Sequence, residues 1–276
     1  MKQLDKKEIT ELLFKASQPV TINLCPENAE DISIEVEDGI TLVCRLHTSA
    51  AEAPSILYFP ATNDSPDSFE KRSAMFRKFG MNVFFVAYRR HDRRISSPAF
   101  STLLQDAVNI VPFVKKVLVD KNYSDELFIM GRSVGSICAV EAIFNYGDDF
   151  KGMIIESGVC TMVSYLNALD TNVEKLGLSE DDDVDLLDKV KKIKVPTLIF
   201  HGAQDPYIPV RQAERIQSYS GARNKQFLVI PGGTHDNLAK IGGELFFQTI
   251  KQFADTICGV NTWRKRRKKQ QSIEEE

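Results

Sequence analysis

Long apolar runs are missing from this chain of 276 residues, and none approaches the roughly 18 residues that a transmembrane helix needs. The segment Met1–Lys15 is interrupted by charges and has no apolar core, so we expect no secretory signal. Hydrophobic residues make up 43% of the chain and charged residues 26%, which excludes an intrinsically disordered protein. The length fits one large α/β domain, or at most two small ones.

Paired cysteines are also missing. The five cysteines are odd in number, scattered, and without CxxC or Cys/His metal spacing: Cys25, Cys44, Cys138, Cys160 and Cys258. Cys44 and Cys138 lie in apolar runs, so we expect them in the core. A sequence without a disulfide framework is typical of a reducing compartment, and we predict a cytoplasmic protein.

A concentration of basic residues of the kind that binds nucleic acid is also missing from the body of the chain. The net charge is −3, and the basic residues concentrate in the tail, where 264–276 holds six basic and three acidic residues. The remaining body is therefore acidic and predicts no nucleic-acid binding. The basic tail beside Trp263 could rest on an anionic membrane, but its composition favours a disordered solubilising segment.

What the chain does contain is a regular alternation of strands and helices. Two early strands, Val20–Leu24 and Ile32–Val36, precede a hairpin partner at Ile40–Leu46. From residue 55 to 257 apolar strand patterns then alternate with helical ones. The predicted strands there are Ser55–Phe59, Asn82–Ala87, Leu127–Met130, Lys151–Glu156, Val195–His201 and Gln226–Ile230. This order predicts one mostly parallel sheet with helices on both faces.

The apolar strand at 127–130 runs into Gly131-Arg132-Ser133-Val134-Gly135, which is followed by a helix pattern up to about Tyr146. A serine that attacks a carbonyl is best presented from a tight strand-to-helix turn, where glycines allow close packing. The start of the helix also places backbone N–H groups where an oxyanion would form. The pattern therefore indicates that Ser133 is a nucleophile.

Such a serine needs a base and an orienting carboxylate. The chain has four histidines, at 47, 91, 201 and 235, and His235 follows the last strand in a glycine-rich loop. Asp205 follows the preceding strand, and loops at the carboxyl ends of parallel strands converge. We predict His235 as the base and Asp205 as its partner. Asp205 as a helix cap and Glu156 as the acid remain alternatives, and His201 is expected to hydrogen-bond within the sheet edge.

The three segments 131–135, 201–209 and 232–235, in the order Ser, Asp, His, resemble the α/β-hydrolase fold family over about residues 20–257. The resemblance implies an eight-stranded, mostly parallel sheet with an antiparallel second strand. It also implies acyl transfer to water through an acyl-serine, with no metal or organic cofactor. By position, the oxyanion hole would use the N–H groups of Thr62 and Val134.

The sequence departs from this family at two loops. Pro60-Ala61 stands where most members have His-Gly, which affects the loop that holds Thr62. Tyr88-Arg89 continues into a dense basic loop instead of a glycine- and serine-rich one. Arg89 and Arg93 could therefore hold an anionic substrate group. A solvated loop, or ion pairs with the acidic segment near 180–185, is the alternative that we favour.

These observations divide the chain into an N-terminal helical extension (1–19), an α/β-hydrolase domain (20–258) and a basic tail (259–276). Residues 158–194 are a candidate small lid. We expect a serine hydrolase that acts on a small carboxylic ester or thioester, with an anionic substrate as one option. Amide or peptide cleavage by the same residues is the alternative within enzymes, and a non-catalytic binding or scaffold protein is the alternative outside them.

Overall fold

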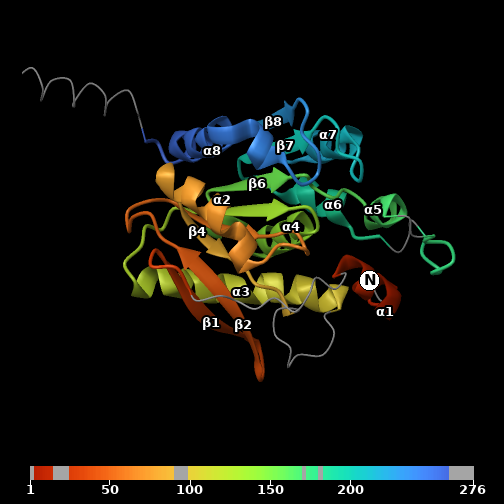
Figure 1. Cartoon of the computed structure of the whole chain (residues 1–276), viewed down its shortest axis with the longest axis horizontal. Helices are drawn as coiled ribbons and strands as arrows, with labels where there is room; N and C mark the ends of the chain where they lie inside the picture. Colours follow the sequence, from red (N-terminus) through yellow and green to blue (C-terminus); the bar gives the residue numbers. More distant parts are fainter. Residues whose placement is uncertain (1–2, 15–24, 90–98, 170–171, 180–182, 261–276) are drawn as a thin grey trace, which may run out of the picture.

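The computed structural model describes residues 3–14, 25–89, 99–169, 172–179 and 183–260, and it contains one eight-stranded sheet (Figure 1). The strand order is β1-β2-β4-β3-β5-β6-β7-β8. The strands are β1 (Ala29–Glu37), β2 (Ile40–His47), β3 (Ser55–Phe59), β4 (Asn82–Phe85), β5 (Leu127–Arg132), β6 (Gly152–Glu156), β7 (Thr197–Gly202) and β8 (Lys225–Ile230). The predicted fold class is confirmed.

Strand β2 is antiparallel to both of its neighbours, β1 and β4, whereas all pairings from β4 to β8 are parallel. The early hairpin is therefore present as the sequence predicts. The other early strand, at 20–24, lies outside the described residues. Parallel strands carry their loops to one edge, so the segments after β3, β5, β7 and β8 can meet there.

Two helical layers cover the sheet. The helices are α1 (Lys7–Leu13), α2 (Pro66–Lys78), α3 (Phe100–Asp120), α4 (Gly135–Tyr146), α5 (Met162–Ala168), α6 (Leu186–Lys192), α7 (Val210–Tyr219) and α8 (Leu238–Ile257). Buried side chains of α2 and α8 form one core with the sheet. Those of α3, α4, α6 and α7 form the core on the other face. The sheet is thus buried on both faces, which explains its near-continuous apolar strands.

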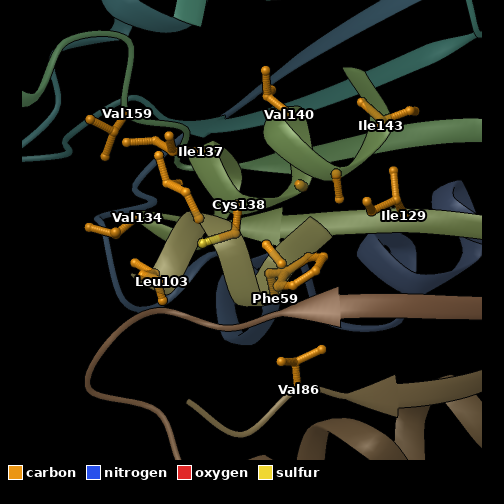
Figure 2. Close-up of a cluster of buried hydrophobic side chains, with 14 of the residues drawn as sticks. Phe59, Val86, Leu103, Ile129, Val134, Ile137, Cys138, Val140, Ile143 and Val159 are labelled. Atoms are coloured by element: carbon orange, nitrogen blue, oxygen red, sulfur yellow. The ribbon is translucent and has the colours of Figure 1, made fainter. Parts of the chain in front are cut away.

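The core beneath α4 fixes the position of the turn that precedes this helix. Figure 2 shows Ile137, Cys138 and Val140 of α4 among apolar side chains of the central strands, including Phe59 and Ile129. Cys138 is fully buried, as its apolar surroundings in the sequence predict. Burial of this kind contributes roughly 1.5–3 kcal/mol for each large side chain, so the start of α4 is firmly held.

Local signals explain where α2 begins. The side chain of Ser65 accepts a hydrogen bond from the Ser68 N–H, and the Ser68 hydroxyl accepts one from the Ser65 N–H. Pro66 occupies the first helical position, where its missing N–H costs nothing. Apolar periodicity alone predicts that the helix starts at Ser68. The helix begins two residues earlier, at Pro66. Within the described part of the chain, no helix combines the length and apolarity that crossing a bilayer requires.

His47, at the end of β2, is fully buried, and neither ring nitrogen has a hydrogen-bond partner among the described residues. Burial lowers its pKa to about 3, and the nearby Arg77 and Arg45 act in the same direction. Phe69 and Glu70 of α2 also face the ring, with Glu70 Oε1 3.9 Å from Nε2. The folded protein therefore holds this imidazole in its neutral form.

This burial predicts a specific loss of stability in acid. Because the unfolded chain binds a proton at His47 near pH 6.5 and the folded chain only near pH 3, stability falls as the pH drops through that window. The slope from this group is at most about 1.4 kcal/mol per pH unit. We expect His47→Leu to match the wild type at neutral pH and to be more stable by about 2 kcal/mol near pH 4.5. Urea unfolding at both pH values measures this, and parallel losses in the two proteins would contradict it.

Candidate active site

The turn between β5 and α4 presents Ser133 in a strained backbone conformation. Its φ is +53°, in the left-handed region that non-glycine residues rarely adopt. A Cβ on Gly131 would lie 2.4 Å from the Gly135 carbonyl oxygen, and one on Gly135 would lie 2.2 Å from the Phe59 oxygen. Both positions of the motif therefore require glycine. Backbone strain of this kind is typical of functional positions.

The structure brings Ser133, His235 and Asp205 together from three loops at the carboxyl edge of the sheet. His235 Nε2 lies 2.8 Å from Ser133 Oγ, and His235 Nδ1 lies 2.9 Å from Asp205 Oδ2. Because a carboxylate only accepts hydrogen bonds, Nδ1 carries the proton and Nε2 is free to accept one from the Ser133 hydroxyl. This arrangement can remove a proton from serine.

The carboxylate of Asp205 is buried and held by the backbone that follows it. Its Oδ1 accepts hydrogen bonds from the N–H groups of Tyr207 at 3.0 Å and Ile208 at 2.9 Å. Burial by itself would raise the pKa of Asp205, but His235 and these two N–H groups outweigh it, and the net pKa is lowered. Asp205 is therefore ionised and can stabilise a positively charged imidazole.

The alternative residues from the sequence are occupied elsewhere. His201 Nε2 lies 2.7 Å from the Ile208 carbonyl oxygen, as expected for a histidine that bonds within the sheet edge. Glu156, the rival acid, is buried and forms an ion pair with Arg72 of α2. His47 is enclosed at the far end of β2, and His91 lies outside the described residues.

The two N–H groups predicted for the oxyanion hole flank the nucleophile. Val134 directly follows Ser133 and caps α4, and Thr62 lines the same cavity as Ser133. Within the described residues, neither N–H donates to another protein group. The loop of Thr62 is closed by Asp64, whose Oδ2 accepts the Ala61 N–H at 3.2 Å.

Arg132, the residue before the nucleophile, connects the loops on both sides of Ser133. Its side chain is only 6% exposed, with one Nη 2.7 Å from Asp64 Oδ2 and the other 2.7 Å from Asp236 Oδ1. The second Nη also approaches the His235 carbonyl oxygen at 3.4 Å. Burial would lower the pKa of Arg132, but the surrounding carboxylates outweigh it, so the guanidinium stays charged. Sequence analysis assigned this residue no role.

A cavity of about 400 Å³ opens beside Ser133 and His235. One part of its wall is apolar and aromatic, formed by Leu12, Leu13, Ala61, Tyr165, Ala168, Leu169 and Tyr207, and the other part is polar, formed by Thr62, Asn63, Ser133, His235 and Asp236. The Tyr165 ring stacks near His235 with a centroid separation of 6.3 Å. Burial raises the pKa of Tyr165, although its hydrogen bond with Ser133 acts the other way. The sequence predicted neither the two tyrosines nor the leucines as cavity residues.

Arg89 corrects one expectation. Its guanidinium is 9% exposed and donates to Asp106 at 2.7 and 2.6 Å and to Glu37 at 2.7 Å. It therefore ties the end of β4 to α3 and β1 and is not available to an anionic substrate. The alternative that the sequence favoured was a solvated loop or ion pairs with the acidic segment near 180–185. Arg89 is ion-paired, but its partners are Asp106 and Glu37. Arg93 and the basic tail lie outside the described residues.

Comparison with known sequences finds similar proteins over most of the chain. The model of the prolyl oligopeptidase family matches residues 104–244, just over half of the chain. The α/β hydrolase domain-containing protein WAV2 of Arabidopsis thaliana is 23% identical over 86% of this chain and 81% of its own length.

Solved esterases share the fold. The Pyrococcus furiosus esterase Pf2001 superposes with a TM-score of 0.70 at 15% identity, over 87% of this chain and 95% of its own. Est1E from Butyrivibrio proteoclasticus, with ferulic acid bound, superposes with a TM-score of 0.65 at 17% identity, over 83% of this chain and 99% of its own.

Proposed function

This chain belongs to the prolyl oligopeptidase family within the α/β hydrolases, and we propose that it cleaves a carboxylic ester or thioester through an acyl-serine intermediate. The observation that carries the proposal is the continuous hydrogen-bonded path from Asp205 through His235 to Ser133, with distances of 2.9 and 2.8 Å. Each step of acyl transfer can be assigned to a described group.

In the first half-reaction, Ser133 Oγ attacks the carbonyl carbon while its proton moves to His235 Nε2. Asp205 keeps the proton on Nδ1 and stabilises the imidazolium. The N–H groups of Thr62 and Val134 donate to the oxyanion, a contribution worth about 10²–10³ in rate for one donor in a well-studied protease. His235 then protonates the departing alcohol or thiol, and the acyl-serine remains.

In the second half-reaction, water replaces the leaving group. His235 Nε2 removes a proton from the water, whose oxygen attacks the acyl carbon. The same oxyanion donors act again, and His235 returns the proton to Ser133 Oγ as the acid is released. No group beyond the described residues is required for the proton balance.

The family supports a second candidate, amide or peptide cleavage. Prolyl oligopeptidases give the family its name, and the same three side chains can protonate a leaving amine. The choice depends on how well His235 protonates a poor leaving group, so matched esters and anilides measure it directly. Ester cleavage is supported by the Pyrococcus furiosus esterase Pf2001, which shares the fold.

A fluorophosphonate probe, followed by peptide mapping, tests the proposal. We expect stoichiometric labelling at Ser133, because only a serine activated by His235 attacks phosphorus at a useful rate. p-Nitrophenyl esters and matched p-nitroanilides then rank the two reactions. Ser136, a buried neighbour that bonds the Ser133 carbonyl, is the internal control and should stay unlabelled. Folded protein without label, or with label elsewhere, would overturn the mechanism and favour a binding or scaffold role.

A further inference from the structure

We infer that helix α1 forms part of the acyl-binding wall and that Leu12 sets the length of the neutral, apolar acyl group that the enzyme accepts. This inference rests on the proposed function and adds a substrate class and a specificity-determining residue to it. The chain places α1 more than 100 residues before the nucleophile, yet Leu12 and Leu13 line the same cavity as Ser133.

Two polar contacts hold the start of helix α1 in place. The carboxylate of Asp5, just before the helix, accepts a hydrogen bond of 2.7 Å from the Ser101 N–H in the first turn of α3. The Lys6 ammonium donates to the Leu176 carbonyl in the segment after α5. The start of α1, which lies near one end of α3 in Figure 1, is therefore tied to two segments that are distant in the sequence.

Apolar packing fixes the orientation of the helix. Leu4 and Ile9 are fully buried, and Leu13 is 5% exposed, all within the core that includes α3 and α4. Glu8 and Glu11 are exposed on the opposite side. Leu12 lies between these two faces and is only half-buried, which leaves part of its side chain open to the cavity.

The facing wall of the cavity comes from α5 and the residue after it. Tyr165, Ala168 and Leu169 lie there, and Tyr207 contributes from the loop after β7. Two short helices, α1 and α5, thus enclose the approach to Ser133. Part of the candidate small lid at 158–194 therefore lines the cavity together with α1.

The described lining residues favour a neutral acyl group. Among its described lining residues, the only ionisable groups are His235, Asp236 and the two tyrosines, and no lysine or arginine side chain lines it. Asp236 carries negative charge and is paired with Arg132. A neutral chain or ring can contact the leucines and tyrosines of this wall, whereas a carboxylate or phosphate would find no cationic partner among the described lining residues.

The test compares Leu12→Ala with Leu12→Trp across p-nitrophenyl esters of increasing straight-chain length. Alanine enlarges the cavity, and the ester with the highest kcat/KM should become a longer one. Tryptophan shortens the cavity, and long-chain esters should lose at least about tenfold in kcat/KM relative to the acetate, the effect of roughly one methylene in an apolar pocket. Glu11→Ala, one residue away on the exposed side, is the matched control and should keep the wild-type profile.

Probe labelling keeps this inference separate from the proposed function. Fluorophosphonates with short and long alkyl chains should show the same opposite shifts in their labelling rates, and thermal unfolding confirms that each variant is folded. Labelled, active variants with an unchanged chain-length profile would overturn the role of Leu12 and leave the proposed function intact. A wild type that neither reacts with the probes nor hydrolyses any ester would instead overturn the proposed function. If Leu12→Trp does not fold, the shift in Leu12→Ala decides the question.

Discussion

Ser133→Ala is expected to lower kcat for ester hydrolysis by about 10⁶-fold, the scale found when the nucleophile of a serine protease is removed. The hydroxyl is the only group at 2.8 Å from His235 Nε2 that can form the acyl intermediate. The substitution removes only the hydroxyl group and leaves the backbone of residue 133, with its φ of +53°, unchanged. The fold should therefore persist. Steady-state kinetics with thermal unfolding measure both effects. Residual activity within tenfold of wild type would show that another group attacks.

Asp205→Asn extends this prediction to the base, with an expected loss of about 10⁴-fold in kcat. The asparagine oxygen would keep the place of Oδ1, which accepts the N–H groups of Tyr207 and Ile208. Its NH₂ would then face His235 Nδ1 and force the proton onto Nε2, which could no longer accept from Ser133. A KM near the wild-type value would show that the loss lies in the chemical steps.

Arg132→Met is expected to lower kcat by about 10²–10³-fold with little change in KM. The reason is that the loop of Thr62, the proposed oxyanion donor, would lose a contact that fixes its position. Arg132 contacts no atom of the Ser133 side chain in the structure, so it acts as a positioning residue. Its bonds to Asp64 and Asp236 hold the loops of Thr62 and His235 at fixed positions. Removing it should also lower the free energy of unfolding by about 1–3 kcal/mol, because the largely buried Asp64 and the buried Glu156 lose a cationic partner.

Three further variants distinguish a loss of loop positioning from a general loss of folding stability. Arg132→Lys keeps the charge but cannot bridge two carboxylates, and should lie between wild type and Arg132→Met in kcat. Asp64→Asn weakens the loop that holds Thr62 and its bond to Arg132 but leaves the bond between Arg132 and Asp236 in place, and it should slow fluorophosphonate labelling. Arg211→Met, an exposed arginine on α7, should change stability by no more than about 0.5 kcal/mol. A kcat for folded Arg132→Met equal to that of wild type would refute the positioning role.

Much of the fold was predictable because it depends on local pattern. Each central strand is a short apolar run between turn residues, and alternation with helices predicts a parallel sheet with covered faces. The predicted helix boundaries were less accurate where hydrogen bonds at the end of a helix determine its first residue. The start of α2 depends on the reciprocal bonds of Ser65 and Ser68, and α8 begins at Leu238, three residues before its expected start, and continues past non-helical Gly243.

The sequence by itself determined which residues could carry the chemistry. Ser133, Asp205 and His235 each follow a strand, and parallel strands deliver their loops to one edge, so their meeting follows from order alone. Tertiary structure alone decided what surrounds them. The pairing of Arg132 with Asp64 and Asp236 joins residues 68 and 104 positions apart, and Arg89 binds Asp106 and Glu37 where an anionic substrate was considered. Leu12 reaches the cavity only because α1 packs against α3 and the segment after α5. Contacts of this kind depend on how distant segments pack, and no local pattern of apolar or charged residues encodes them.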